Sequence, residues 1–122
     1  LTMHPLLGKP YAFPSKPPES FDCWTLVKFI RAQQGLPCPL PFKDTEEWCI
    51  PGAIAMAVEY ARGLWREVPQ PKVHDMAVLC REHVGIVVPG GVLHAFQRNS
   101  SVIFTTFPVI RRVWPNAEWW TA

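Results

Sequence analysis

The hydrophobic pattern of this 122-residue chain changes near Trp65, and that change limits the available folds more than any other feature. Before Trp65, apolar residues recur at three- and four-residue spacing, which is typical of amphipathic helices. After Trp65, short runs rich in β-branched residues alternate with turn residues, which is typical of strands. This order of elements predicts an α+β domain in which N-terminal helices pack on one side of an antiparallel sheet.

Two helical regions are expected before this change. The first runs from about Asp22 to Gln34, and Gly35 supplies a stop signal because glycine often ends helices. The second occupies about residues 43–63, where Pro51-Gly52 either divides it into two short helices or kinks one. Prolines are frequent in residues 1–20, which should therefore form an extended loop.

The second half of the chain predicts about five strands. A tight hairpin is expected at Pro89-Gly90-Gly91 and a further turn at Gln97–Ser100. Because the strands follow one another with short connections, they should form an antiparallel meander. The predicted strands are Met76–Leu79, His83–Val88, Val92–Phe96, Val102–Phe107 and Ile110–Trp114.

Length and composition narrow the functional classes. The chain is long enough for one domain, so residues 1–122 are expected to form a single unit. The net charge of +2, from 12 basic and 10 acidic residues, does not indicate a nucleic-acid partner. The longest apolar run, Ala53–Val58, is too short to span a membrane, and no uncleaved secretory signal is expected. The four cysteines follow no dense disulfide pattern, so reduced thiols are expected.

Cys23 lies in the first turn of the first predicted helix. There, the helix dipole and the unpaired backbone N–H groups favour a thiolate, which is the reactive form of cysteine. Asp22, directly before it, is suited to cap the helix. The alternative is a buried cysteine that packs as a small hydrophobe.

A nucleophilic cysteine needs a base, and histidine is the usual one because its pKa lies near neutral pH. Of the four histidines, His83 and His94 lie on neighbouring predicted strands. Whether their side chains share a face depends on the register of the hairpin between them. A rival interpretation is a zinc site built from Cys80, His83 and neighbouring histidines, although the chain offers no second close-spaced pair of ligands.

Five short segments follow one another along most of the chain. They are Gly8-Lys9-Pro10-Tyr11, Phe21-Asp22-Cys23-Trp24-Thr25-Leu26-Val27, His74-Asp75-Met76-Ala77, His83-Val84-Gly85-Ile86-Val87-Val88 and Leu93-His94-Ala95. Their residues, order and spacing resemble those of the NlpC-type cell-wall cysteine peptidases, a branch of the papain-like superfamily.

This resemblance implies a papain-like fold and a catalytic set that uses no metal or cofactor. In it, Cys23 is the nucleophile, His83 is the general base and His94 orients the His83 ring. Tyr11 would help the Cys23 backbone N–H bind the oxyanion, with Asp22 as a supporting residue. General-base catalysis typically contributes ~10²–10⁴-fold, so the loss of either imidazole should slow acyl transfer strongly.

Two departures from the family pattern concern the substrate. Trp24-Thr25 follow the cysteine where the family usually has Ser-Gly, and Ala12–Ser15 stand where it often has x-x-Gly-Gly. These positions shape the cleft wall in the family, which makes Trp24 a candidate substrate contact. The Asp-Cys-Trp variant looks most like the phage tail-assembly members.

The resemblance therefore implies a hydrolase of amide bonds in peptidoglycan stem peptides, next to D-glutamate and diaminopimelate. It further implies phage tail-tip partner proteins, synthesis in the bacterial cytoplasm, a place in the virion tail, and action in the periplasm or cell wall. Two alternatives remain open. One is a non-catalytic tail assembly or structural protein on the same fold, and the other is a secreted antibacterial cell-wall effector.

Overall fold

The computed structural model describes residues 4–39, 58–59 and 62–122. The predicted helical segment 43–63 lies outside the described residues except at 58–59, which are helical, and at 62–63. None of the helices in the described ranges has the length and hydropathy needed to cross a membrane. The elements are α1 (Cys23–Gln33), β1 (Arg66–Val68), β2 (Met76–Cys80), β3 (His83–Val88), β4 (Gly91–Phe96), the 3₁₀ helix η2 (Gln97–Asn99), β5 (Ser101–Thr106), α3 (Phe107–Val113) and β6 (Glu118–Thr121).

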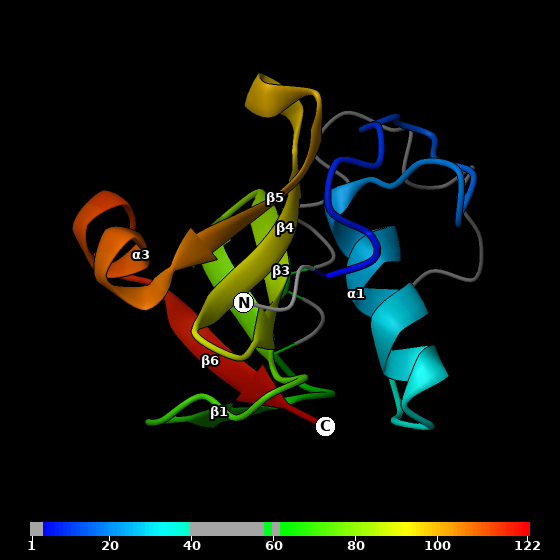
Figure 1. The fold of residues 1–122 in the computed structure, drawn as a ribbon. Coiled ribbons are helices and arrows are strands. Elements are labelled where there is room, and N and C mark those ends of the chain that lie inside the picture. The colour runs from blue at the N-terminus through cyan, green and yellow to red at the C-terminus, as the bar shows by residue number, and fades with distance from the viewer. Residues whose placement is uncertain (1–3, 40–57, 60–61) are drawn as a thin grey trace.

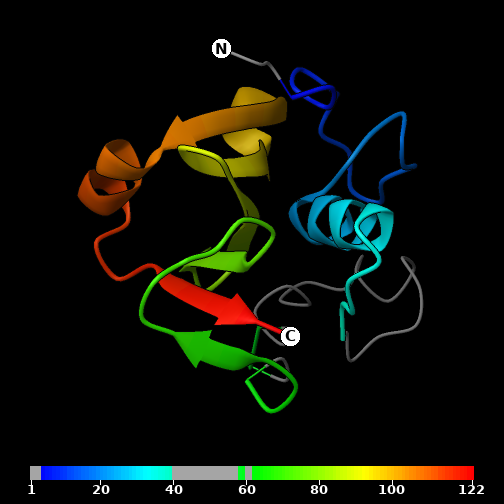
Figure 2. The same cartoon turned by 60° about the horizontal axis from the view of Figure 1, so that its bottom comes forward.

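The six strands form one antiparallel sheet in the order β1-β6-β2-β3-β4-β5. Helix α1 packs on the sheet through β3 and β4, whereas α3 lies on the other side, beside β4 and β5 (Figure 1). The second view keeps the two helices on opposite sides of the sheet (Figure 2). The predicted α+β class, with a helix packed on an antiparallel sheet, is therefore confirmed.

Four predicted strands are confirmed, because their ends differ from β2, β3, β4 and β5 by no more than one residue. The hairpin between β3 and β4 turns at Pro89-Gly90, and Val88 pairs with Gly91 across it. Gly90 has a φ of +87°, which residues with a side chain rarely adopt. Glycine thus permits the tight turn that the sequence predicts.

The fifth predicted strand, Ile110–Trp114, is wrong. Residues 110–113 belong to α3, and Trp114 caps this helix. Pro108 sits in its first turn, where the missing backbone N–H has no intrahelical partner to lose. Phe107, Ile110 and Trp114 follow helical spacing and pack in the same apolar cluster. Burial of this face outweighs the β-branched composition that favoured a strand.

Two further strands, β1 and β6, are absent from the prediction because they contain only three and four residues. Strand β6 lies between β1 and β2. Trp120 of β6 is buried in the core on the α1 side, whereas Trp119 points the other way and packs edge-on against Phe107. The alternation of side chains along a strand explains why two consecutive tryptophans serve opposite faces.

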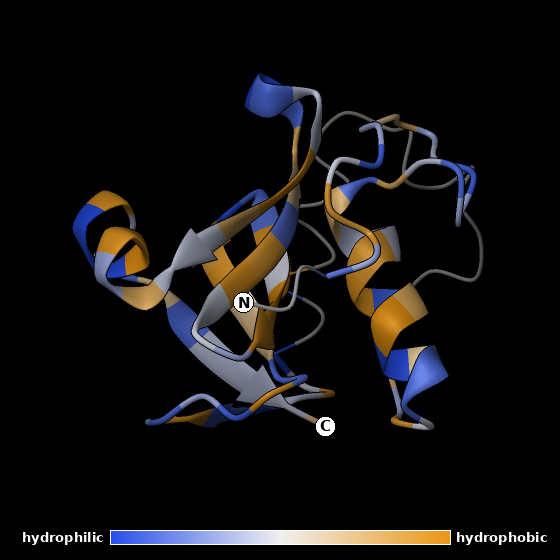
Figure 3. Cartoon of the chain, viewed as in Figure 1, coloured by the Kyte–Doolittle hydropathy of each residue, from blue (hydrophilic) through white to orange (hydrophobic). Residues whose placement is uncertain are grey.

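Each face of the sheet buries its own apolar cluster. The hydropathy colouring shows apolar residues on α1 and the central strands, and a hydrophilic η2 (Figure 3). The cluster on the α1 side is the larger, and its members include Cys23, Trp24, Leu26, Val27, Ile30, Met76, Val84, Ile86, Leu93, Ala95 and Trp120. The cluster on the α3 side contains Ala77, Leu79, Val87, Val92 and Ile110.

Arg31, near the end of α1, joins three separate segments although only 1% of its surface is exposed. Its guanidinium donates hydrogen bonds to the carbonyl oxygens of Pro37 at 2.7 Å, of Ala122 at 2.6 Å, and of His74. The same group lies 4.8 Å from the centre of the Trp65 ring, in cation–π geometry. Arg31 therefore ties the helix to the loop before β2 and to the residue after β6.

Candidate active site

A hydrogen-bond network fixes the start of α1 and therefore the position of Cys23. Asp22 is the N-cap: its Oδ1 accepts from the Thr25 N–H at 2.9 Å, and the Thr25 hydroxyl accepts from the Asp22 N–H at 3.0 Å. Ser15 adds a hydrogen bond to the Asp22 carboxyl at 3.1 Å and one to Thr25 at 2.7 Å. This capping box confirms the predicted role of Asp22 and makes Cys23 the first helical residue.

The Cys23 thiol is buried, with 4% of the residue exposed. Burial raises the pKa of the Cys23 thiol to about 12, and the neighbouring Asp22 carboxyl adds to this rise. The nearby backbone N–H groups of Val84, Trp24 and Cys23 itself favour the thiolate and oppose the rise in pKa. The helix N-terminus therefore acts in the predicted direction, but desolvation outweighs it and the resting sulfur is a thiol.

The sulfur lies where the ladder between β3 and β4 ends. Its last described pair is Ile86 with Leu93. The backbone N–H and C=O of Val87 form hydrogen bonds with Asp75 and His74, in the loop before β2. Because these groups alternate sides along a strand, those of Val84 and Ile86 point the other way, toward β4. The N–H of Val84 thus points to the β4 side beyond the last pair, and there it donates to the Cys23 sulfur.

His83 and His94 form a hydrogen-bonded chain that ends on a threonine. His83 Nε2 lies 2.7 Å from His94 Nδ1, and His94 Nε2 lies 2.9 Å from the Thr105 hydroxyl. The two imidazoles come this close because β3 and β4 approach each other at Gly85. A Cβ on Gly85 would lie only 2.9 Å from the His94 Cβ. The two predicted imidazoles therefore share a face and contact each other.

Aromatic rings enclose the two imidazoles. The Phe96 ring stacks on His83 at 4.9 Å, and Trp114 meets His94 edge-on at 5.6 Å between ring centres. Burial lowers the pKa of His83 to about 4. Burial, and then the neighbouring His83, lower the pKa of His94 to about 3. Both rings are therefore neutral at neutral pH, and a neutral imidazole is the form that can accept a proton.

Tyr11 lies on the thiol side of the site. It forms an isolated backbone bridge with Phe21 and packs against the core that contains Cys23. Burial raises the pKa of the Tyr11 hydroxyl to about 12, and the Cys23 and Asp22 acidic groups add to the rise. The structure thus brings Tyr11, Asp22 and Cys23 together, as the sequence predicts.

The thiol and the imidazole pair both adjoin the start of β3. Val84, whose N–H contacts the Cys23 sulfur, directly follows His83 in the chain. Within the described part of the chain, no hydrogen bond joins the sulfur to either imidazole. Because His83 Nε2 is engaged by His94, Nδ1 is the His83 nitrogen left for the thiol.

Trp24 occupies a different place from the one expected. It is fully buried in the core between α1 and the sheet, rather than on the wall of a cleft. In an α-helix, neighbouring residues point in directions about 100° apart, so Trp24 can be buried in the core while Cys23 lies near the start of β3. The expected substrate contact at Trp24 is therefore not supported by its burial.

Two alternatives for the cysteines can be judged in the described ranges. These ranges contain no group of three or more His, Cys, Asp and Glu residues that could hold a metal ion. Cys23, Cys38 and Cys80 are free thiols there, and Cys49 lies outside the described residues. Neither a zinc site nor a disulfide is formed by these three cysteines.

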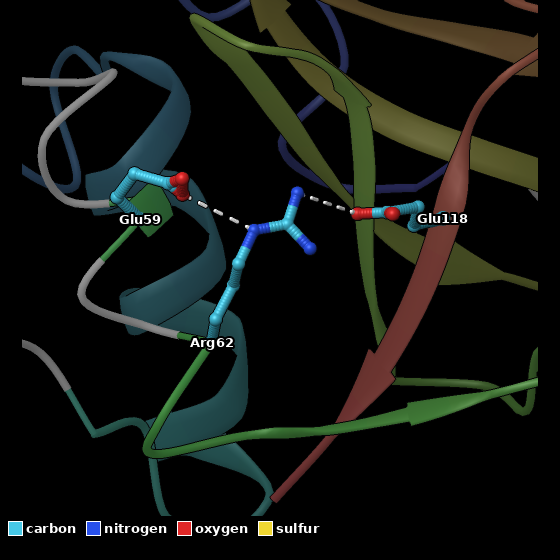
Figure 4. A network of polar contacts seen from close by, with 3 residues as sticks. All are labelled: Glu59, Arg62 and Glu118. Atoms are coloured by element: carbon cyan, nitrogen blue, oxygen red, sulfur yellow. Dashed lines mark hydrogen bonds and ion pairs between the residues drawn. The ribbon is translucent and has the colours of Figure 1, made fainter.

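A pocket of about 540 Å³ shares Trp114 with the aromatic enclosure of His94, but neither imidazole lines it. At its rim, Arg62 bridges Glu59 at 3.2 Å and Glu118 at 3.3 Å (Figure 4). The Arg62 side chain is about half exposed, so these ion pairs contribute little stability.

Thr105, Ser15 and Trp114 take part in the site although the sequence interpretation did not select them. Ser15 contacts residues seven and ten positions further along the chain, and Thr105 and Trp114 reach His94 from other elements; the periodicity of the sequence does not reveal such contacts. Comparison with protein-family models, curated proteins and solved structures found no match for this chain.

Protein stability should decrease as the pH falls below about 6.5, the pKa of unfolded histidine. Because the pKa values of His83 and His94 fall to about 4 and about 3 on folding, the unfolded chain binds more protons between these values and 6.5. The free energy of unfolding should then drop by up to ~1.4 kcal/mol per pH unit for each imidazole. Urea titrations at several pH values between about 7.5 and 4.5 measure this slope.

The variant His94→Gln provides the control for this slope. Glutamine retains a hydrogen-bonding side chain but does not titrate in this range. Its dependence on pH should be shallower than that of the wild type, which also separates the imidazoles from the carboxyl groups. Equal slopes for the two proteins would contradict the assignment of the acid sensitivity to the imidazole pair.

Proposed function

We propose that this chain is a papain-like cysteine peptidase or amidase that hydrolyses amide bonds in peptidoglycan stem peptides as part of a phage tail. One observation carries the catalytic part of the proposal. A thiol at a helix N-terminus and a chain of two neutral imidazoles converge on consecutive residues, Val84 and His83. The substrate and the tail location rest on the resemblance to NlpC-type peptidases.

The proposed chemistry begins when the sulfur leaves the Val84 N–H and reaches His83 Nδ1 at the start of β3. Nδ1 takes the proton of the Cys23 thiol while the sulfur attacks the amide carbonyl carbon. The resulting oxyanion accepts hydrogen bonds from the Cys23 N–H and the Tyr11 hydroxyl. The imidazolium of His83 then gives its proton to the amine as the C–N bond breaks, leaving a thioester.

Water completes the cycle. His83 Nδ1 takes a proton from the attacking water, a second oxyanion forms, and its collapse breaks the C–S bond. The thiolate recovers the proton from His83. Throughout, His94 holds the His83 ring through Nε2, so that Nδ1 stays directed to the reacting atoms.

Turnover of purified muropeptides by the freshly reduced protein tests this proposal. We expect new amine ends to appear with time, and we expect iodoacetamide added together with muropeptide to stop their appearance, because alkylation of Cys23 removes the nucleophile. A fresh protein that releases no amine ends would count against the catalytic function. Mass spectrometry of the products identifies the bond that is cut.

A second candidate is a non-catalytic tail assembly protein on the same fold, and the burial of Cys23 favours it. A sulfur with 4% exposure and a pKa of about 12 reacts slowly unless the site opens. The rate of Cys23 alkylation in the presence and absence of muropeptide separates the two candidates. A catalytic site should react faster when substrate or substrate analogue opens it, whereas a structural thiol should remain inert.

A further inference from the structure

The chain of hydrogen bonds from His83 does not stop at His94. His94 is fully buried, and both of its ring nitrogens are engaged, Nδ1 by His83 and Nε2 by Thr105. A neutral imidazole carries one N–H donor and one acceptor nitrogen. His94 must therefore donate to one neighbour and accept from the other. The hydrogen bonds can thus run in two directions, either from His83 toward Thr105 or from Thr105 toward His83, and we call these two directions the polarities.

The two polarities differ in what they leave at His83. If His94 donates to Thr105, its Nδ1 accepts from His83 Nε2–H, and His83 Nδ1 keeps a lone pair. If Thr105 donates instead, His94 Nδ1 carries the proton and His83 Nε2 accepts. His83 Nδ1 then holds the hydrogen and cannot take a proton from Cys23. Only the first polarity is compatible with His83 as a base.

Protonation of His83 permits only the first polarity, in which His94 donates to Thr105. As an imidazolium, His83 has hydrogens on both nitrogens, so Nε2 can only donate. His94 Nδ1 must then accept, and its single N–H must lie on Nε2, where the Thr105 hydroxyl is the acceptor at 2.9 Å. Without that acceptor, a buried N–H would lose its partner each time the imidazolium forms.

We propose that Thr105 is a positioning residue that fixes the Nε2–H tautomer of His94 and so keeps His83 Nδ1 ready to accept the proton of Cys23. This inference rests on the proposed cysteine-hydrolase function. The hydroxyl suits the role because oxygen has two lone pairs for His94, while Thr105 is partly exposed and can direct its own hydrogen to solvent. Thr105 acts through His94 and touches no reacting atom.

The test compares Thr105→Val, which preserves shape and removes the hydroxyl, with Thr105→Ser, which preserves the hydroxyl. Two quantities are measured: kcat/KM for muropeptides and the ¹⁵N chemical shifts of the His94 ring, assigned with His94→Gln. We expect Nε2–H in the wild type and in Thr105→Ser. Thr105→Val should shift the tautomer toward Nδ1–H and lower kcat/KM by ~10- to 100-fold.

Three results would overturn the inference: His94 protonated on Nδ1 in the wild type, a Thr105→Val variant with unchanged tautomer or kcat/KM, or a loss in Thr105→Val that Thr105→Ser shares. Thr105→Ala gives a second hydroxyl deletion if valine disturbs the pairing of β4 with β5. The tautomer is measured without substrate. A wild-type protein with the expected tautomer but no hydrolysis would therefore refute the proposed function and leave the tautomer assignment intact.

Discussion

Replacement of Cys23 by alanine should reduce muropeptide hydrolysis at least ~10³-fold, to the rate observed without protein. Alanine has no atom that can attack the carbonyl carbon or carry the acyl group as a thioester. The remaining groups, including the imidazole pair, stay in place because Cys23 contributes little to the capping network of Asp22 and Thr25. The measured quantity is the rate at which new amine ends appear at a fixed muropeptide concentration.

The matched control is Cys80→Ala. Cys80 is the exposed thiol at the end of β2, and its removal should leave the rate within about twofold of the wild type. Far-UV circular dichroism of both variants confirms that each is folded. If Cys23→Ala hydrolyses muropeptides as fast as the wild type, Cys23 is not the nucleophile.

Replacement of Arg31 by methionine should lower the free energy of unfolding by about 3–5 kcal/mol. Methionine keeps apolar contact with Trp65 but removes the charged donors that serve three carbonyl groups. The carbonyls of Pro37, His74 and Ala122 would lose a charge-assisted partner at once. Urea-induced unfolding near neutral pH, followed by tryptophan fluorescence, measures the change.

Two variants delimit the role of Arg31. Arg112→Met removes an exposed arginine from α3 and should change the free energy of unfolding by less than about 0.5 kcal/mol. Arg31→Lys should recover only part of the loss, because an ammonium group lacks the planar fork that reaches several carbonyls. A stability of Arg31→Met equal to that of Arg112→Met would show that the three hydrogen bonds contribute nothing.

Local sequence patterns predicted the elements for which residue composition, spacing and turn or cap residues all indicate the same structure. Asp22 caps α1, Gly90 turns the hairpin, and four runs of β-branched residues form the central strands. They failed at α3, where Val109 to Val113 have strand-like composition but helical spacing. There the choice depends on which face can be buried, and that is decided by β4 and β5 together with Trp119.

The relation between His83 and His94 shows what the hairpin added to the sequence. The motif placed them on neighbouring strands but left their register open. The two-residue turn pairs Val88 with Gly91, and the same register continued beyond the last pair brings Gly85 close to His94. His83, two residues further, then lies diagonal to His94 on the same face. A shift of one residue would have moved His94 to the α1 side.

The sequence by itself determined α1 and the strands that carry Cys23, His83 and His94, because caps, turns and strand alternation are local properties. Only the tertiary structure decided the chemical state of these side chains and their further partners. Burial turns Cys23 from an expected thiolate into a thiol, takes Trp24 out of any cleft, and keeps both imidazoles neutral. Desolvation depends on all the segments that cover a group, and Thr105 reaches His94 only because β5 pairs with β4.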